Sequence, residues 1–232
     1  MPFHFRQFSV EDTQSSMRTG TDAVLLGAWT DPGLAMSILD IGTGSGLIAM
    51  MLAQKCEAVI DAIDPDVPSY EQCKCNFRNC PWSHRLTAIL GRIQNYRDKK
   101  YQLIVSNPPY FRNSLRASRA GRSNARHNDE LTFEELLEAA EQLLTPDGKF
   151  TVILPASELK TITGIAARQL LFCHRILEII PKPGREPLRV LMEFRRMQGK
   201  HVTAGQLTLR DEHNAFTPEY RELTKDYYLD LP

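Results

Sequence analysis

The segment Asn107-Pro108-Pro109-Tyr110 combines residue types that can hold a flat amino group. The amino nitrogen of adenine or of an amide is a poor nucleophile because its lone pair is delocalised, so its reaction depends on positioning and charge complementarity. The side-chain oxygen of Asn107 and the carbonyl oxygen of Pro108 can accept the two N–H protons of such an amine. This arrangement predicts transfer of a group to a planar amino nitrogen.

The prolines and the tyrosine of this segment suit the same role. Proline fixes its own φ and restricts the residue before it, so we expect Asn107 in an extended, stiff loop. Tyr110 offers a ring on which a flat substrate can stack, a contact worth roughly 1–3 kcal/mol per base. The alternative interpretation is a proline-stabilised turn with a buried tyrosine.

A glycine-rich loop, Gly42-Thr43-Gly44-Ser45-Gly46, follows a short apolar run. Glycines at alternate positions let the chain turn sharply and let its backbone approach a ligand. The helix expected to follow offers unpaired N–H groups to a carboxylate or phosphate. Leu47 occupies the position where a dinucleotide fingerprint needs its third glycine, so the loop suits a smaller anion, such as the methionine carboxylate of S-adenosylmethionine. A purely structural tight turn is the alternative.

Two acids lie at the ends of expected strands. Asp40 precedes the glycine loop and can orient the cationic methionyl part of such a ligand. Asp64 ends the next apolar run, where a carboxylate can accept both hydroxyls of a ribose; a local contact beside Pro65 is the alternative. Ligands of an open α/β sheet bind at the carboxyl ends of its strands. The glycine loop, Asp64 and Asn107 are therefore expected to meet at one edge of the sheet.

The elements that must position these residues alternate between strand-like and helix-like segments. Strands are expected at residues 37–41, 58–63, 85–90, 102–106, 150–154, 174–180 and 189–195, and helices at residues 46–54, 69–79, 132–144 and 158–171. Such alternation is typical of an α/β fold with a mostly parallel sheet, here seven-stranded, and helices on both faces. The short connection Pro181-Lys182-Pro183-Gly184 predicts an antiparallel hairpin and an antiparallel edge strand.

Composition favours a globular protein and argues against several other classes. Apolar residues make up 42% of the chain and charged residues 24%, as in soluble proteins. No apolar run approaches the roughly 20 residues that span a bilayer, and the N-terminus lacks the apolar core of a signal peptide, so a cytoplasmic protein is expected. The five cysteines lack the spacing of a disulfide framework or a zinc site, so no metal is expected.

Positive charge is concentrated in two stretches, although 28 basic and 28 acidic residues cancel over the whole chain. The first stretch contains no acid and directly follows Tyr110; it comprises Arg112, Arg116, Arg119, Arg122 and Arg126. These arginines are candidates for holding the phosphates of a nucleic acid. The second stretch runs from Lys182 to His201, and a solvated face is an equally good interpretation of it.

These motifs resemble the class I S-adenosylmethionine-dependent methyltransferases with an Asn-Pro-Pro-Tyr motif, which act on N6 of adenine or N5 of glutamine. A closer resemblance rests on Phe5-Arg6-Gln7-Phe8, Met17-Arg18-Thr19-Gly20-Thr21-Asp22, Leu25-Leu26-Gly27-Ala28-Trp29 and Tyr220-Arg221-Glu222-Leu223-Thr224. These residues are similar to the family that N6-methylates the adenosine beside the anticodon, position 37, of a bacterial valine tRNA. The resemblance implies a Rossmann-like fold, a monomer, S-adenosylmethionine as cofactor and tRNA as substrate, with no obligate protein partner.

The resemblance also implies roles for individual residues. Asn107, Pro108, Pro109 and Tyr110 would be catalytic, and the cofactor would be bound by Thr21, Asp22, Asp40, Gly42, Gly44, Gly46, Asp64, Arg92, Ile93 and Asn107. Thr21 or Asp22 is equally suited to N-cap a helix at residues 23–29. Arg92 replaces the acid that commonly accepts from the adenine amine of the cofactor, and a guanidinium has no acceptor. A backbone carbonyl or packing would then hold the adenine.

The implied organisation is a single methyltransferase domain. Its core would be residues 36–200, with residues 1–35 covering cofactor and substrate and residues 201–232 as a C-terminal extension.

Three alternatives compete with a tRNA enzyme. The first is a protein glutamine methyltransferase, which usually has an N-terminal helical domain. The second is a DNA or ribosomal RNA adenine methylase, of which the DNA enzymes normally add a sizeable target-recognition domain. A binding protein that has lost catalysis would not need Asp40, Asp64 and Asn107 together.

Overall fold

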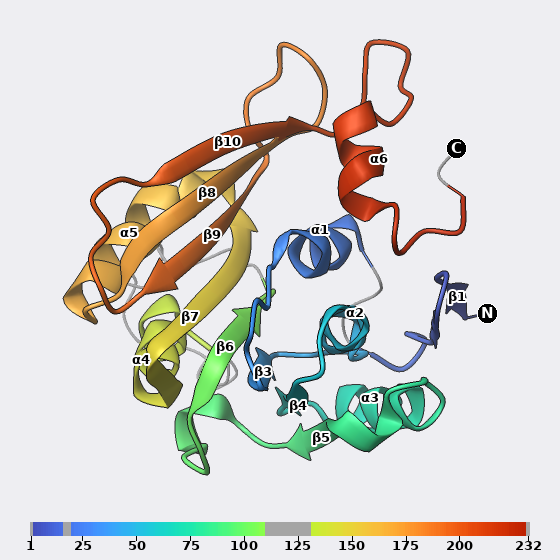
Figure 1. Cartoon of the computed structure of the whole chain (residues 1–232), viewed down its shortest axis with the longest axis vertical. Helices are drawn as coiled ribbons and strands as arrows, with labels where there is room; N and C mark the ends of the chain where they lie inside the picture. The colour runs from blue at the N-terminus through green and yellow to red at the C-terminus, as the bar shows by residue number, and fades with distance from the viewer. Residues whose placement is uncertain (1, 16–19, 110–130, 231–232) are drawn as a thin grey trace, which may run out of the picture.

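An eight-stranded sheet forms the centre of the molecule in the computed structural model, which describes residues 2–15, 20–109 and 131–230 (Figure 1). The strand order is β10-β8-β9-β7-β6-β3-β4-β5. The strands, in chain order, are β3 (Ser37–Ile41), β4 (Val59–Asp64), β5 (Leu86–Leu90), β6 (Tyr101–Ser106), β7 (Leu144–Pro155), β8 (Phe172–Ile180), β9 (Arg189–Arg195) and β10 (Thr203–Thr208). All adjacent strands are parallel except β9, which is antiparallel to β7 and β8.

Helices cover both faces of the sheet. One hydrophobic core lies under α1 (Thr21–Trp29), α2 (Leu47–Lys55) and α3 (Val67–Arg78), and a second lies under α4 (Phe133–Leu143) and α5 (Leu159–Arg168). Short 3-10 turns, η1 (Ser83–Arg85), η2 (Ile93–Asn95) and η3 (Ala156–Glu158), join some of these elements. The central strands β3 and β6 are buried on both faces, which explains why apolar residues on them follow one another without alternation, as in Leu103-Ile104-Val105. The expected Rossmann-like α/β fold is confirmed.

The number of strands differs from the expected seven because β10 extends the sheet beyond the β8–β9 hairpin. β10 pairs in parallel with β8 along six residues. Of these six residues only Leu207 is buried, so the segment has no apolar run by which a strand can be predicted. The expected antiparallel hairpin of β8 and β9 is present, and β10 pairs with β8 on its outer side.

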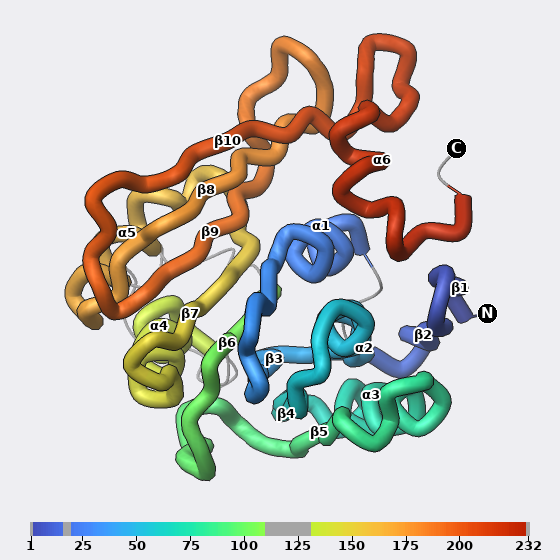
Figure 2. Tube along the Cα trace, viewed as in Figure 1, coloured from blue at the N-terminus to red at the C-terminus, as the bar shows by residue number. Residues whose placement is uncertain are grey.

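The first and last described segments of the chain lie side by side (Figure 2). β1 (Phe3–His4) and β2 (Ser9–Val10) form a small hairpin, and α6 (Pro218–Thr224) precedes the C-terminal segment. Arg6 donates from Nε to the carbonyl oxygen of Tyr228 at 2.7 Å, and the Phe5 ring stacks on that of Tyr228. Tyr227 donates its hydroxyl to the carbonyl oxygen of Met51 in α2 at 3.2 Å. Both ends of the chain thereby pack on the helices that cover one face.

None of the helices that the structure describes is long and apolar enough to cross a membrane.

Candidate active site

The carboxyl ends of β4, β3 and β6 bring three sequence motifs to one edge of the sheet (Figure 1). Ile41, the last residue of β3, is in register with Ile63 of β4 and Ser106 of β6. The glycine loop therefore begins between Asp64 and Asn107. With neighbouring strands about 4.8 Å apart, these two residues lie roughly 10 Å from each other across the loop.

The glycine loop needs its glycines for backbone conformation and for close packing. Gly42, Gly44 and Gly46 have φ angles of 70°, 57° and 84°, a region that other residues rarely adopt. A Cβ at Gly46 would lie 2.6 Å from Cε1 of Phe77, so the loop packs directly on α3. α2 begins at Leu47 without a side-chain cap. The Ala49 amide of this first turn acts as a donor to the Asp40 carboxyl and lowers its pKa, whereas the two amides before it suit an anionic group.

Asp64 braces both the glycine loop and the turn after β4. Its Oδ2 accepts a hydrogen bond from the Gly44 amide at 2.8 Å, and its Oδ1 accepts one from the Asp66 amide at 2.9 Å. Burial raises the pKa of this carboxyl by desolvation. The local contact considered as an alternative role is therefore present. Each carboxylate oxygen retains a lone pair for a further donor, so the two roles are compatible.

Asp40 is completely buried beside the glycine loop. Its Oδ2 accepts a hydrogen bond from Oγ1 of Thr43 at 2.7 Å, whereas its Oδ1 has no hydrogen-bond partner among the described residues. Burial raises the pKa of Asp40 to about 7, and the hydrogen bond from Thr43 offsets part of that effect. A buried carboxyl with a raised pKa and an unused oxygen is typical of a functional site, because a cationic ligand would stabilise its ionised form.

Asn107 is buried directly after β6 and also keeps a polar atom unused. It is 7% exposed, and its Oδ1 accepts no hydrogen bond from any residue that the structure describes. Ser106 donates its hydroxyl to the carbonyl oxygen of Ile41 at 2.9 Å, which ties the ends of β6 and β3 together. Leaving a buried acceptor unpaired costs about 1–3 kcal/mol. Such an atom is expected where a ligand supplies the donor.

Several predicted site residues lie outside the described residues. They are Tyr110 and the arginines of the first basic stretch, Arg112, Arg116, Arg119, Arg122 and Arg126. Their assignment to substrate stacking and phosphate binding stays a prediction. Of their motif neighbours, Pro108 is buried and Pro109 is exposed.

The start of α1 differs from the prediction. Gly20 is the N-cap and both Thr21 and Asp22 lie in the first turn, so the interpretation of either residue as the N-cap is wrong. Asp22 instead forms an ion pair with Nε of Arg189 at 2.8 Å. Arg189 is in register with Pro155 at the end of β7, so this pair lies at the carboxyl edge of the sheet. Contact of Thr21 and Asp22 with a cofactor stays a prediction.

The connection after β5 lies next to Asp64, because the Gly91 amide donates to the carbonyl oxygen of Asp64 at 3.1 Å. Arg92 is exposed, and the following Ile93 is only 4% exposed and belongs to the core under α4 and α5. Since a guanidinium accepts no hydrogen bond, an adenine bound here would be held by backbone groups or by packing.

Two residues that the sequence did not single out connect the glycine loop to its surroundings. Asn76 of α3 donates from Nδ2 to the carbonyl oxygens of Ser45 and Glu11, both at 2.8 Å. The Ser15 hydroxyl would lie 3.2 Å from a Cβ at Gly44. The partners of Asn76 are 31 and 65 residues distant in the chain, so no local spacing indicates these contacts.

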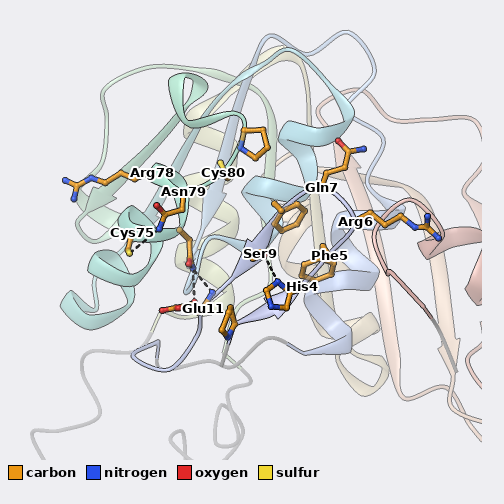
Figure 3. Close-up of a pocket in the computed structure, with 14 residues that line it drawn as sticks. His4, Phe5, Arg6, Gln7, Ser9, Glu11, Cys75, Arg78, Asn79 and Cys80 are labelled. Carbon is orange, nitrogen blue, oxygen red and sulfur yellow. Dashed lines mark hydrogen bonds between the residues drawn. The ribbon is translucent and has the colours of Figure 1, made fainter.

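A surface pocket of about 770 Å³ lies between α3 and the N-terminal segment (Figure 3). In its wall, Nδ1 of His4 and the Ser9 hydroxyl share a hydrogen bond of 2.8 Å. The Arg78 side chain points away from the pocket in Figure 3. The pocket's α3 residues, Cys75, Asn76 and Arg78, come from the last turns of the helix. The pocket is thus distant from the start of α3, which follows Asp64, and we assign it no chemistry.

The cysteines offer no metal centre within the described part of the chain. There, no group of three or more His, Cys, Asp or Glu side chains could hold a metal ion. Cys73 and Cys80 are buried free thiols, and Cys75 is exposed. Burial raises the pKa of Cys73 well above its ordinary value, so this thiol stays protonated and unreactive.

The sequence is similar to known proteins over nearly its whole length. Residues 14–162 match the model of the methyltransferase small domain family. A protein of Bacteroides fragilis named tRNA1(Val) (adenine(37)-N6)-methyltransferase is 41% identical over 99% of this chain and 98% of its own. Proteins of the same name from Phocaeicola vulgatus and Trichodesmium erythraeum are 42% and 40% identical, over 99% and 98% of this chain and 98% and 97% of their own.

Solved structures share the fold. A predicted O-methyltransferase from Agrobacterium tumefaciens superimposes with a TM-score of 0.69 at 18% identity, covering 89% of this chain and 96% of that chain. A glycopeptide N-methyltransferase solved with S-adenosylmethionine gives a TM-score of 0.55 at 12% identity, covering 79% and 96%. At such low identity the likeness concerns the fold alone.

Proposed function

This chain belongs to the methyltransferase small domain family, in the branch named tRNA1(Val) (adenine(37)-N6)-methyltransferases, and from this premise we propose that it methylates N6 of an adenosine beside the anticodon of a tRNA. The methyl donor is S-adenosylmethionine. The observation that carries the proposal is the unused, buried Oδ1 of Asn107 next to the glycine loop. An acceptor in that position suits an amino group brought to the methyl donor.

The residues at the carboxyl edge fit S-adenosylmethionine by charge and by shape. The unused Oδ1 of Asp40 suits the cationic methionyl part, and the start of α2, which has no side-chain cap, suits its carboxylate. Asp64 has lone pairs for the ribose hydroxyls. A Cβ at Gly44 or Gly46 would meet neighbouring side chains at 3.2 Å or less, so the shape of the loop depends on glycine at these positions.

In the proposed mechanism the protein holds the amine and does not need a strong base. S-adenosylmethionine held by these residues would supply a methyl group on a sulfonium, and transfer to the amine would form an N–C bond while breaking the S–C bond and leaving a neutral thioether. Asn107 Oδ1 and the Pro108 carbonyl oxygen accept hydrogen bonds from the two N–H groups of the amine. These bonds direct the nitrogen lone pair towards the methyl group. The nitrogen becomes cationic in this step, and the same two acceptors stabilise that charge. One proton then leaves to solvent.

The choice of tRNA rests on the relatives rather than on the site. An amide amine fits the same acceptors as adenine, so Asn107 alone is compatible with protein glutamine. The names of relatives about 40% identical over the whole chain support adenine in tRNA. An anticodon loop presents unpaired bases, so extruding the target costs less than flipping a base from a duplex.

A transfer assay tests this choice directly. The purified protein is incubated with radiolabelled S-adenosylmethionine and, side by side, total tRNA, total ribosomal RNA and total protein from cells that lack it. We expect label in tRNA alone. Label confined to protein would overturn the proposal, as would label in ribosomal RNA alone.

Asp40 gives a prediction about pH. Its pKa is raised to about 7 by burial, whereas an unfolded aspartate titrates near 4, so its protonated form is favoured on folding. The stability contributed by this group is complete below about pH 4 and is lost as the pH rises through about 7. A cationic cofactor favours the ionised form, so affinity should increase from about pH 5.5 to about pH 7 and then level off. Calorimetry across this range, in buffers of different ionisation enthalpy, measures affinity and proton release together.

The matched control for this prediction is Asp40→Asn, which keeps the shape and removes the titration. Its affinity should be lower and nearly independent of pH. If the cofactor affinity of Asp40→Asn changes with pH as steeply as that of the wild type, Asp40 does not contact the cofactor.

We propose a single methyltransferase domain that acts as a monomer in the cytoplasm, where its tRNA substrate would be met. Light scattering on a size-exclusion column, with and without tRNA, tests the monomer.

A further inference from the structure

The tip of the β8–β9 hairpin and the segment after β10 enclose a second surface pocket, of about 570 Å³. Figure 1 draws both connections at the top of the view, beside each other. Three cations line this pocket, Lys182, Arg185 and Arg210, and its apolar lining consists of Pro181, Leu188 and Leu209. We call it the hairpin-tip pocket.

Strand register puts the hairpin-tip pocket at the same edge of the sheet as Asn107. β8 is three strands away from β6 in the sheet, which corresponds to about 14 Å. Val152 of β7 is in register with Ser106, whereas Pro155, three residues later, is in register with Arg189. Those three residues add about 10 Å along the strand. The pocket therefore begins roughly 17 Å from the end of β6, a length that about five phosphates of a stacked nucleic-acid strand would cover.

The second basic stretch is divided by the fold into paired and unpaired cations. Arg189, Arg195 and Arg196 form ion pairs with Asp22, Glu193 and Glu141. Lys182 and Arg185, by contrast, are exposed and have no carboxylate within ion-pair distance in the described part of the chain.

The residues that line the hairpin-tip pocket carry more positive than negative charge. Arg210 stacks its guanidinium at 3.9 Å on the Phe216 ring and donates to the carbonyl oxygen of Asn214 at 2.6 Å. Glu186 is the acid among the residues that line the pocket. Three cations thus face one acid, which is the charge balance of a site for a polyanion.

Backbone hydrogen bonds hold the hairpin-tip pocket in shape. The Leu209 amide donates to the carbonyl oxygen of Ile180 at 2.8 Å, and the Arg210 amide donates to that of Pro181 at 3.2 Å. Prolines at positions 181, 183 and 187 restrict the tip further. Leu188 stays 53% exposed at this rigid tip. A preformed site avoids the entropy cost of ordering a loop when it binds.

We propose that the hairpin-tip pocket binds the sugar-phosphate backbone of the RNA substrate on the side of the active site away from β4 and β5, an inference that rests on the proposed function. Lys182 and Arg185 contact phosphates, and the exposed Leu188 side chain lies against a sugar or base. Lys182 and Arg185 of the second basic stretch are then substrate contacts, whereas its Arg189, Arg195 and Arg196 form structural ion pairs.

The test is the double variant Lys182→Ala/Arg185→Ala, since both side chains are exposed and neither supports the fold. We expect the KM for tRNA to rise about tenfold, with kcat and cofactor affinity unchanged. The slope of log affinity for tRNA against log salt concentration should fall by between about 1.4 and 1.8, the value for two lost phosphate contacts. The matched control, Arg78→Ala/Lys200→Ala, removes one arginine and one lysine from exposed positions elsewhere and should leave both quantities at wild-type values.

Two outcomes separate this inference from the function on which it rests. If the wild type methylates tRNA and the double variant keeps its KM and salt slope, the pocket is not an RNA site. The same holds if the control pair changes KM and slope as much as the double variant, because the effect would then be one of net charge. If the wild type binds no tRNA and labels only protein, the proposed function itself has failed.

Discussion

Replacing Asn107 by alanine is expected to lower kcat by on the order of 10³-fold, which corresponds to about 4 kcal/mol of transition-state stabilisation. The variant loses the buried Oδ1 that has no partner among the described residues and that we assign to an N–H of the amine. Since this oxygen acts on the substrate, cofactor affinity should stay almost unchanged. Single-turnover kinetics with tRNA, together with calorimetry for the cofactor, measure the two quantities separately.

A buried polar truncation elsewhere controls for general damage to the fold. Thr224→Ala removes a completely buried hydroxyl that donates to the carbonyl oxygen of Tyr220 in α6, and we expect it to retain wild-type turnover. Turnover of Asn107→Ala within a few fold of the wild type would show that Asn107 does not hold the amine.

Replacing Asp64 by alanine is expected to weaken cofactor binding by on the order of 10²-fold, or about 3 kcal/mol. Two effects add. The variant loses the acceptors for the ribose hydroxyls, and it also leaves the Gly44 amide, now bonded to Oδ2 at 2.8 Å, without its partner. Calorimetry gives the dissociation constant, and thermal unfolding reports the loss of the brace.

A cofactor analogue without ribose hydroxyls distinguishes these two effects. If Asp64 binds the ribose, the analogue should bind the wild type and Asp64→Ala with more similar affinities than the natural cofactor does. If Asp64 only braces the glycine loop, the substitution should weaken both ligands by the same factor. That second result would remove the ribose role while leaving the structural one.

The sequence was sufficient for the strands that are determined by a local pattern and for the edge of the sheet at which they place the candidate site residues. The bounds of β3 and β9 agree with the expected residues 37–41 and 189–195, because each is a short, buried and mostly apolar run between clear breaks. The alternate glycines of residues 42–46 predicted a turn with a close approach, and all three have positive φ. Because β3, β4 and β6 are parallel and each motif follows the end of one of them, the glycine loop, Asp64 and Asn107 meet at one edge of the sheet.

What the sequence did not indicate depends on contacts between distant segments. The ion pair between Asp22 and Arg189 joins residues 167 positions apart, and it gives Asp22 a different role from the expected helix cap. β10 forms because β8 offers an open edge, not because Thr203–Thr208 has a strand-like pattern of its own. The division of the second basic stretch into paired and unpaired cations likewise follows from which carboxylates the fold brings near.

The measurement that tests the central claim most directly is mass spectrometry of nucleosides and of mapped fragments from tRNA of cells with and without this protein. We predict that N6-methyladenosine next to the anticodon of one tRNA is present in the first sample and absent from the second, and that the wild-type protein restores it whereas Asn107→Ala does not. An unchanged tRNA nucleoside profile, together with the loss of a methylated glutamine from a cellular protein, would contradict the account.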